Sequence, residues 1–145
     1  MKESIIENIK GTWLLVSMKI IHTNGETADM FGENPQGISM FDAEGFMNAQ
    51  MGSGIRPNFI SDSVNTGTSE EIANAYQTYM AFYGRYAEKS PGILTVHIEN
   101  GLFPNWKEKE IIRYAEINGN LLTLSTPETK TEGDSFYVKA VWRKV

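Results

Sequence analysis

The residues best suited to chemistry lie on a predicted strand and on the strand expected to follow it. His97 and Glu99 are two residues apart, so on a strand their side chains share one face. If the next hairpin turns near Pro104, His97 lies opposite Ile112 or Arg113, and an imidazole, a carboxylate and a guanidinium come close together. Such a cluster can bind an anion or transfer a proton.

The same strand also fits an orientation in which these polar groups face water. Leu94, Val96 and Ile98 alternate with His97 and Glu99, and a half-buried strand normally turns its apolar face inward. The sequence leaves both orientations open. The inward one would make the three polar groups candidate catalytic and ligand-binding residues, and the outward one would make them surface residues.

Two further polar residues are candidates for binding a ligand. Asn48 lies on another predicted strand, where an inward amide would need a ligand, a water or a polar neighbour, although outward placement is the simpler alternative. Arg56 precedes Pro57 at the start of a polar loop over residues 56–67. Long loops in compact domains are often lids or binding loops, so Arg56 could meet an acidic group at a cavity mouth.

Aromatic residues gather at two places that could border a cavity. Tyr79 and Tyr83 lie near the end of the predicted helix, where phenol rings either suit a flat apolar ligand or pack in the core beneath the helix. Phe103 and Trp106 belong to a loop that would shield polar residues from water. We therefore count these four residues among the candidate ligand-binding residues.

Several classes of function lack the residues that they need. His22 and His97 are the only histidines and cysteine is absent, which excludes a three-histidine metal site and thiolate chemistry. The sequence also has no glycine-rich phosphate loop, no Gly-x-Ser-x-Gly motif and no EF-hand spacing. A net charge of −5 argues against nucleic acid as a partner. We expect neither a metal nor a cofactor.

Strands must position most of these residues. Alternation, β-branched content and turn signals predict about eight strands with hairpin connections, near residues 12–22, 36–41, 46–51, 83–88, 93–99, 110–117, 121–125 and 136–143. One helix is inserted around residues 68–83, where Thr68 and Glu71 form a capping box and apolar residues repeat at helical spacing. The predicted fold is an all-β, antiparallel up-and-down barrel.

Tryptophans at both ends of the chain indicate how this barrel closes. Gly11-Thr12-Trp13 opens the first strand and Trp142-Arg143 lies near the end of the last. We predict that Trp13 plugs the closed end and that Arg143 packs against its indole ring or hydrogen-bonds the backbone of the nearby first turn, so that the first and last strands are neighbours. A closed barrel of about eight strands has an interior large enough for one small ligand.

Length and composition limit the organisation of the chain. The 145 residues, 41% of them hydrophobic, suffice for a single domain over residues 1–145. No segment approaches the roughly 20 consecutive apolar residues of a membrane span, and the N-terminus lacks the features of a signal peptide. We expect a cytoplasmic protein with no membrane partner. An edge strand could pair with a second copy, which leaves a homo-oligomer open.

Short motifs along the chain resemble a known family. They are Gly11-Thr12-Trp13, Phe31-Gly32-Glu33-Asn34-Pro35-x-Gly37, Arg56-Pro57, Phe103-Pro104-Asn105-Trp106 and Leu121-x-x-Leu124-Ser125-Thr126-Pro127. In order and spacing they resemble the small lipocalin-like domain family of bacteria and fungi, a calycin-type barrel, from about Gly11 to Val145. The resemblance implies a fold and a cavity, and it names no reaction.

Two hypotheses about function follow. The first is a binding protein whose barrel holds a small hydrophobic or weakly acidic metabolite. The alternative is a cofactor-independent isomerase or cyclase, in which the same cavity folds a substrate and His97, Glu99 or Arg113 polarises it. Only the alternative requires a titratable residue to act inside the cavity.

Overall fold

A computed structural model describes residues 3–145 and shows an antiparallel β-barrel. Its strands are β1 (Gly11–His22), β2 (Thr27–Asp29), β3 (Gln36–Phe41), β4 (Phe46–Gly52), β5 (Tyr79–Ser90), β6 (Ile93–Gly101), β7 (Glu110–Asn118), β8 (Leu121–Ser125), β9 (Thr129–Thr131) and β10 (Asp134–Lys144). One helix, α1 (Ser69–Gln77), and a short 3-10 turn, η1 (Pro104–Trp106), complete it.

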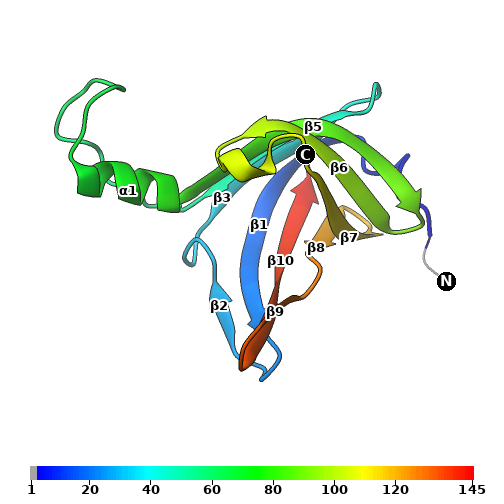
Figure 1. Cartoon of the computed structure of the whole chain (residues 1–145). Coiled ribbons are helices and arrows are strands. Elements are labelled where there is room, and N and C mark those ends of the chain that lie inside the picture. The colour runs from blue at the N-terminus through cyan, green and yellow to red at the C-terminus, as the bar shows by residue number, and fades with distance from the viewer. Residues whose placement is uncertain (1–2) are drawn as a thin grey trace.

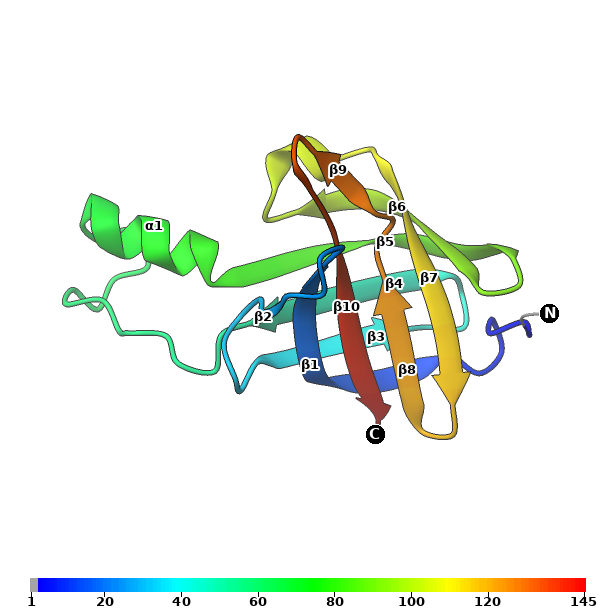
Figure 2. The same cartoon turned by 90° about the horizontal axis from the view of Figure 1, so that it is seen from below.

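Pairing between the first and last long strands closes the barrel. The sheet order is β2-β1-β3-β4-β5-β6-β7-β8-β10-β9, and β1 also pairs with β10. Eight strands therefore form the wall, while the short strands β2 and β9 extend β1 and β10 at one end (Figures 1 and 2). The predicted fold class, an up-and-down barrel of about eight strands with one inserted helix, is confirmed.

Trp13 lies at the closed end, as predicted, and is fully buried. Its indole Nε1 donates a hydrogen bond of 2.8 Å to the carbonyl oxygen of Ile9, in the N-terminal turn that covers this end. The prediction for Arg143 is wrong, because the side chain of Arg143 is exposed and the Nζ of Lys144 lies 5.0 Å from the centre of the Trp13 ring. Lys144 is the residue in register with Trp13, and its neighbour on the strand points outward.

The helix begins as predicted and ends earlier. Thr68 and Glu71 form the expected capping box, but α1 ends at Gln77 and the next residues pair with β4 as strand β5. Apolar residues that repeat at helical spacing normally mark the side of a helix that packs on a core. Instead α1 projects away from the wall (Figure 1), and Ile72 and Tyr76 are 53% and 45% exposed. No helix in residues 3–145 is long and apolar enough to cross a membrane.

The barrel interior follows alternation along most of the strands. On β6, Leu94, Val96 and Ile98 are buried. The alternating residues His97 and Glu99 face outward. On β10, Ala140 and Trp142 are buried in the same way. The interior is therefore apolar wherever the pattern is regular, and any polar residue at an inward position stands out.

Candidate functional site

A cavity of about 210 Å³ lies inside the barrel. Apolar side chains from all parts of the wall line it, including five methionines: Met18, Met30, Met47, Met51 and Met80. Methionine is unbranched and flexible, so it can adapt its shape to different ligands. The volume is below the 300–1,000 Å³ that is usual for sites of drug-sized ligands, so a matching ligand must be small.

Arg113 is the charged residue of this cavity. It lies on β7 in register with Leu94, a buried residue of β6, and its side chain is half-buried and lines the cavity. Its Nη1 donates a hydrogen bond of 2.8 Å to the carbonyl oxygen of Ile112. No carboxylate within residues 3–145 forms an ion pair with it, and burial lowers its pKa to about 10. Arg113 is thus a cation in an apolar site with unfilled capacity to bind an anion.

Two residues that line the same cavity carry buried polar atoms. The Oγ of Ser39 and the Nε1 of Trp142 are buried, and neither finds a hydrogen-bond partner in the part of the chain that the structure describes. Thr126 also lines the cavity, but its hydroxyl oxygen accepts a hydrogen bond of 2.9 Å from the backbone N–H of Val138. Ser39 and Trp142 therefore join Arg113 as polar residues in the wall of the cavity.

Trp106 connects the η1 segment to the cavity. It lines the cavity and packs edge to face on Phe82, with ring centres 5.5 Å apart. Phe103 contacts Trp106 from the other side at 5.9 Å and is not among the residues that line the cavity. Of the two aromatic residues expected in this loop, Trp106 is placed to touch a ligand inside the barrel, and Phe103 supports it.

His97 and Glu99 lie on the outside of the barrel. His97 is exposed and its Nε2 lies 3.4 Å from Oε2 of Glu108, while Oε1 of Glu99 lies 3.4 Å from Nε of Arg85. The predicted pairing of His97 with Ile112 or Arg113 is wrong, since His97 is in register with Glu110. The structure therefore separates both residues from Arg113, and the expected cluster of three polar groups does not form.

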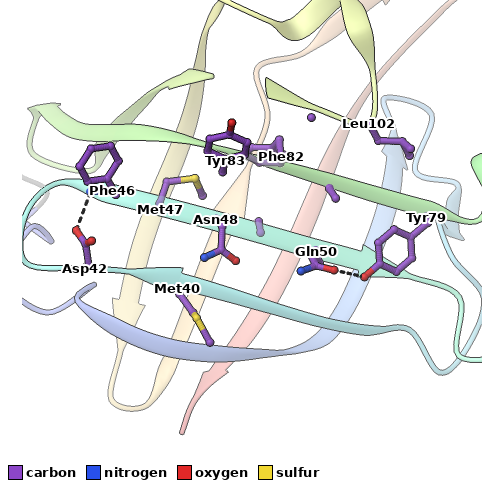
Figure 3. A pocket seen from close by; sticks show the side chains of 13 residues that line it. Met40, Asp42, Phe46, Met47, Asn48, Gln50, Tyr79, Phe82, Tyr83 and Leu102 are labelled. Carbon is purple, nitrogen blue, oxygen red and sulfur yellow. Dashed lines mark hydrogen bonds between the residues drawn. The ribbon is translucent and has the colours of Figure 1, made fainter. Parts of the chain in front are cut away.

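Three other candidates border a groove on the outer surface of β3, β4 and β5. Asn48 and Tyr83 line it, and Tyr79 donates a hydrogen bond of 2.5 Å from its hydroxyl to Oε1 of Gln50 (Figure 3). Arg56 lies beside this groove, with its guanidinium 4.8 Å from the centre of the Tyr79 ring. These residues are on the opposite side of the wall from the cavity, because inward-facing Met47, Ala49 and Met51 alternate with the outward residues of β4.

Comparison with known proteins agrees with the fold. A family model described as a lipocalin-like domain matches residues 10–145. The chain belongs to the lipocalin-like domain family. A search of curated proteins finds no match. A lipocalin-like barrel suggests ligand binding in general, and the residues of the cavity must supply anything more specific.

In this lipocalin-like domain, sequence analysis missed Ser39 and Trp142 as cavity residues. Ser39 lies between apolar residues on β3. Because it is two residues from buried Phe41, the alternation of a strand indicates that both side chains face inward. In the sequence analysis, Trp142 only marks, together with Arg143, the end of the last strand. Its position two residues from Ala140 on an alternating strand places its ring inside, and the unpaired state of its N–H becomes visible only in three dimensions.

Proposed function

We propose that this lipocalin-like domain binds a small, mainly apolar molecule that carries an acidic group, with Arg113 holding the anion. The observation that supports this most directly is a guanidinium that lines an apolar cavity and has no carboxylate partner in residues 3–145. A buried charge is costly unless it is paired, so proteins rarely keep one without a use for it. An anionic ligand would supply the missing pair.

The size of the cavity limits the ligand. An engineered cavity of about 150 Å³ holds benzene, which has six heavy atoms. By that scale the cavity of about 210 Å³ accepts about eight to ten heavy atoms. Short- to medium-chain carboxylic acids such as hexanoate and octanoate, and small aryl acids, fall in this range.

The alternative function as an isomerase or cyclase has less support. It relied on His97, Glu99 or Arg113 acting inside the cavity, and the first two lie on the outer surface. Arg113 alone can polarise a carbonyl or enolate oxygen, but general acid–base catalysis needs a group that exchanges protons near neutral pH. Binding is therefore the function that the arrangement favours.

Octanoate tests the proposal, with 1-octanol as an uncharged analogue of equal chain length. Calorimetric titration should show that octanoate binds more tightly than the alcohol. Arg113→Met should weaken octanoate binding by about 10- to 150-fold, the effect of losing one hydrogen bond to a charged group. Arg143→Met removes an exposed arginine and serves as the control, with unchanged affinity. Equal binding of octanoate to the Arg113 variant would overturn the proposal.

A further inference from the structure

Two buried polar atoms in the cavity remain unexplained by a ligand with a single acidic group. Ser39 and Trp142 are 1% and 2% exposed, and both line the cavity. Neither the Ser39 hydroxyl nor the Trp142 indole N–H has a hydrogen-bond partner in residues 3–145. Nearly all buried polar groups in folded proteins are paired, so each exception calls for a specific explanation.

The other buried tryptophan shows that this is not a general property of the barrel. Trp13 is also fully buried, and its Nε1 donates to the carbonyl oxygen of Ile9 at 2.8 Å. Trp13 and Trp142 lie on neighbouring strands, and Trp142 is in register with Leu15, two residues along β1 from Trp13. The chain thus pairs the indole that plugs the closed end and leaves unpaired the indole that faces the cavity.

The two unpaired atoms come from strands on either side of β1. Ser39 of β3 is in register with Trp13 of β1, and Trp142 of β10 is in register with Leu15 of β1. Both strands pair directly with β1, so the two residues belong to one region of the wall. Each of the two side chains carries one hydrogen-bond donor, and the Ser39 hydroxyl can also accept.

Arg113 belongs to a different part of the wall. Trp142 is in register with Leu122 of β8, and Leu122 is in register with Ile117 of β7. Arg113 is four residues from Ile117 along β7, which corresponds to roughly 13 Å at about 3.3 Å per residue. Arg113 and Trp142 both line the same cavity, so one molecule inside it can contact both residues.

We propose that the ligand carries a second oxygen, a hydrogen-bond acceptor placed at the opposite end of its apolar chain from the acid, which accepts from Trp142 Nε1 and Ser39 Oγ. The ligand class is then an oxo or hydroxy carboxylic acid of about eight to ten heavy atoms rather than a plain fatty or aryl acid. This inference rests on the proposed function, since the acid at Arg113 orients the molecule.

Two matched pairs of ligands test the inference by calorimetric titration. They are hexanoate with 5-oxohexanoate, and heptanoate with 6-oxoheptanoate, so that within each pair only the ketone oxygen differs. In a cavity without a free donor, an added ketone weakens binding because it loses its hydrogen bonds to water. We expect at least one oxo acid to bind about fivefold more tightly than its parent, the size expected of one neutral hydrogen bond.

Conservative variants identify the donor. Trp142→Phe keeps an aromatic ring and removes the N–H, so it should abolish the preference for the oxo acid and leave the affinity for the parent acid within about twofold. Ser39→Ala should reduce the same preference. Arg143→Met, at an exposed position outside the cavity, is the control and should leave the preference intact.

A measurement on the unaltered protein keeps the test valid if a variant fails to fold. In a proton–nitrogen correlation spectrum, the indole N–H signal of Trp142 should shift when the preferred oxo acid is added. The parent acid should produce a smaller shift of the same signal. If the plain acids bind through Arg113 and neither oxo acid binds more tightly, the inference fails and the proposed function stands. If no acid of either pair binds, both fail.

Discussion

Replacing Arg113 by methionine should stabilise the empty barrel and weaken the loaded one. Methionine has a similar length, and five methionines already line the cavity, so the replacement should pack without a large void. The change removes a charge that has no carboxylate partner in residues 3–145. The same charge is the group that the proposed ligand needs.

The size of the effect follows from the ionisation of Arg113. Burial lowers its pKa to about 10, and each pKa unit below the ordinary value for arginine corresponds to about 1.4 kcal/mol. The charged form therefore costs at most about 3.5 kcal/mol in the empty barrel. The side chain is only half-buried and keeps its hydrogen bond to Ile112, so we expect a gain of about 1–2 kcal/mol in the free energy of unfolding.

Urea unfolding at pH 7, with and without octanoate, measures both effects. Without ligand, the variant should be more stable than the original protein. At a ligand concentration of about 100 times Kd, the original protein should gain about 2.7 kcal/mol and the variant much less, so the order of stability reverses. Arg143→Met, the exposed control, should change stability by less than about 0.5 kcal/mol in either condition.

One result would refute this reasoning. If Arg113→Met destabilises the empty protein by more than about 1 kcal/mol and octanoate still stabilises both proteins equally, Arg113 is a structural residue that supports the barrel. Its hydrogen bond to the carbonyl oxygen of Ile112 would then be its main role.

Two further predictions test the closed end and the outer surface. Trp13→Ala should lower the free energy of unfolding by about 3–5 kcal/mol, because it empties a fully buried aromatic site, and a loss under about 1 kcal/mol in urea melts would show that Trp13 is not the plug. His97→Ala should leave octanoate affinity within about twofold, because the imidazole is exposed and contacts Glu108 on the outside. A tenfold loss in titration would contradict that placement.

Much of the barrel could be predicted from residue patterns. Alternation on β6 places Leu94, Val96 and Ile98 on one face of the strand and the polar residues on the other. Of the two orientations open for His97, the structure shows the outward one. Pattern alone could not choose, because either face can be buried if a ligand satisfies the polar one. The tertiary pairing of β6 with its neighbours makes the choice.

The inward position of Arg113 was harder to predict. Ile111 and Ile112 are adjacent at the start of β7, so apolar residues occupy both faces of the strand there. The sequence does not show which of these faces points into the barrel. Ala115 and Ile117 lie on the same face of β7 as Arg113, and their apolar side chains indicate that this face points inward. A charged residue at an inward position conflicts with the local pattern, and such conflicts are expected at functional sites.

The register between β6 and β7 depends on a connection that the sequence does not specify. The expected turn at Pro104 is a 3-10 segment followed by Glu108 with a positive φ of 64°, and the backbone N–H of Glu108 donates to the carbonyl oxygen of Ile98. These local features set the pairing of His97 with Glu110. Composition and periodicity give no access to such a backbone conformation.

The end of the helix was ambiguous for a different reason. Tyr79, Met80 and Tyr83 fit helical spacing, and aromatic residues also favour strands. Pairing with β4, in which Gly52 lies opposite Tyr79 and Met51 opposite Met80, places them in β5. Tertiary pairing overrides the local preference, whereas the capping box at Thr68 is a local signal and was predicted correctly.

A crystal structure of the protein with octanoate tests the central claim most directly. We predict electron density for the chain within the barrel, among the methionines that line the cavity, with the carboxylate within hydrogen-bond distance of the Arg113 guanidinium. The account is contradicted if octanoate occupies only the outer groove beside Asn48 and Tyr79, or if it lies in the barrel with its carboxylate turned away from Arg113.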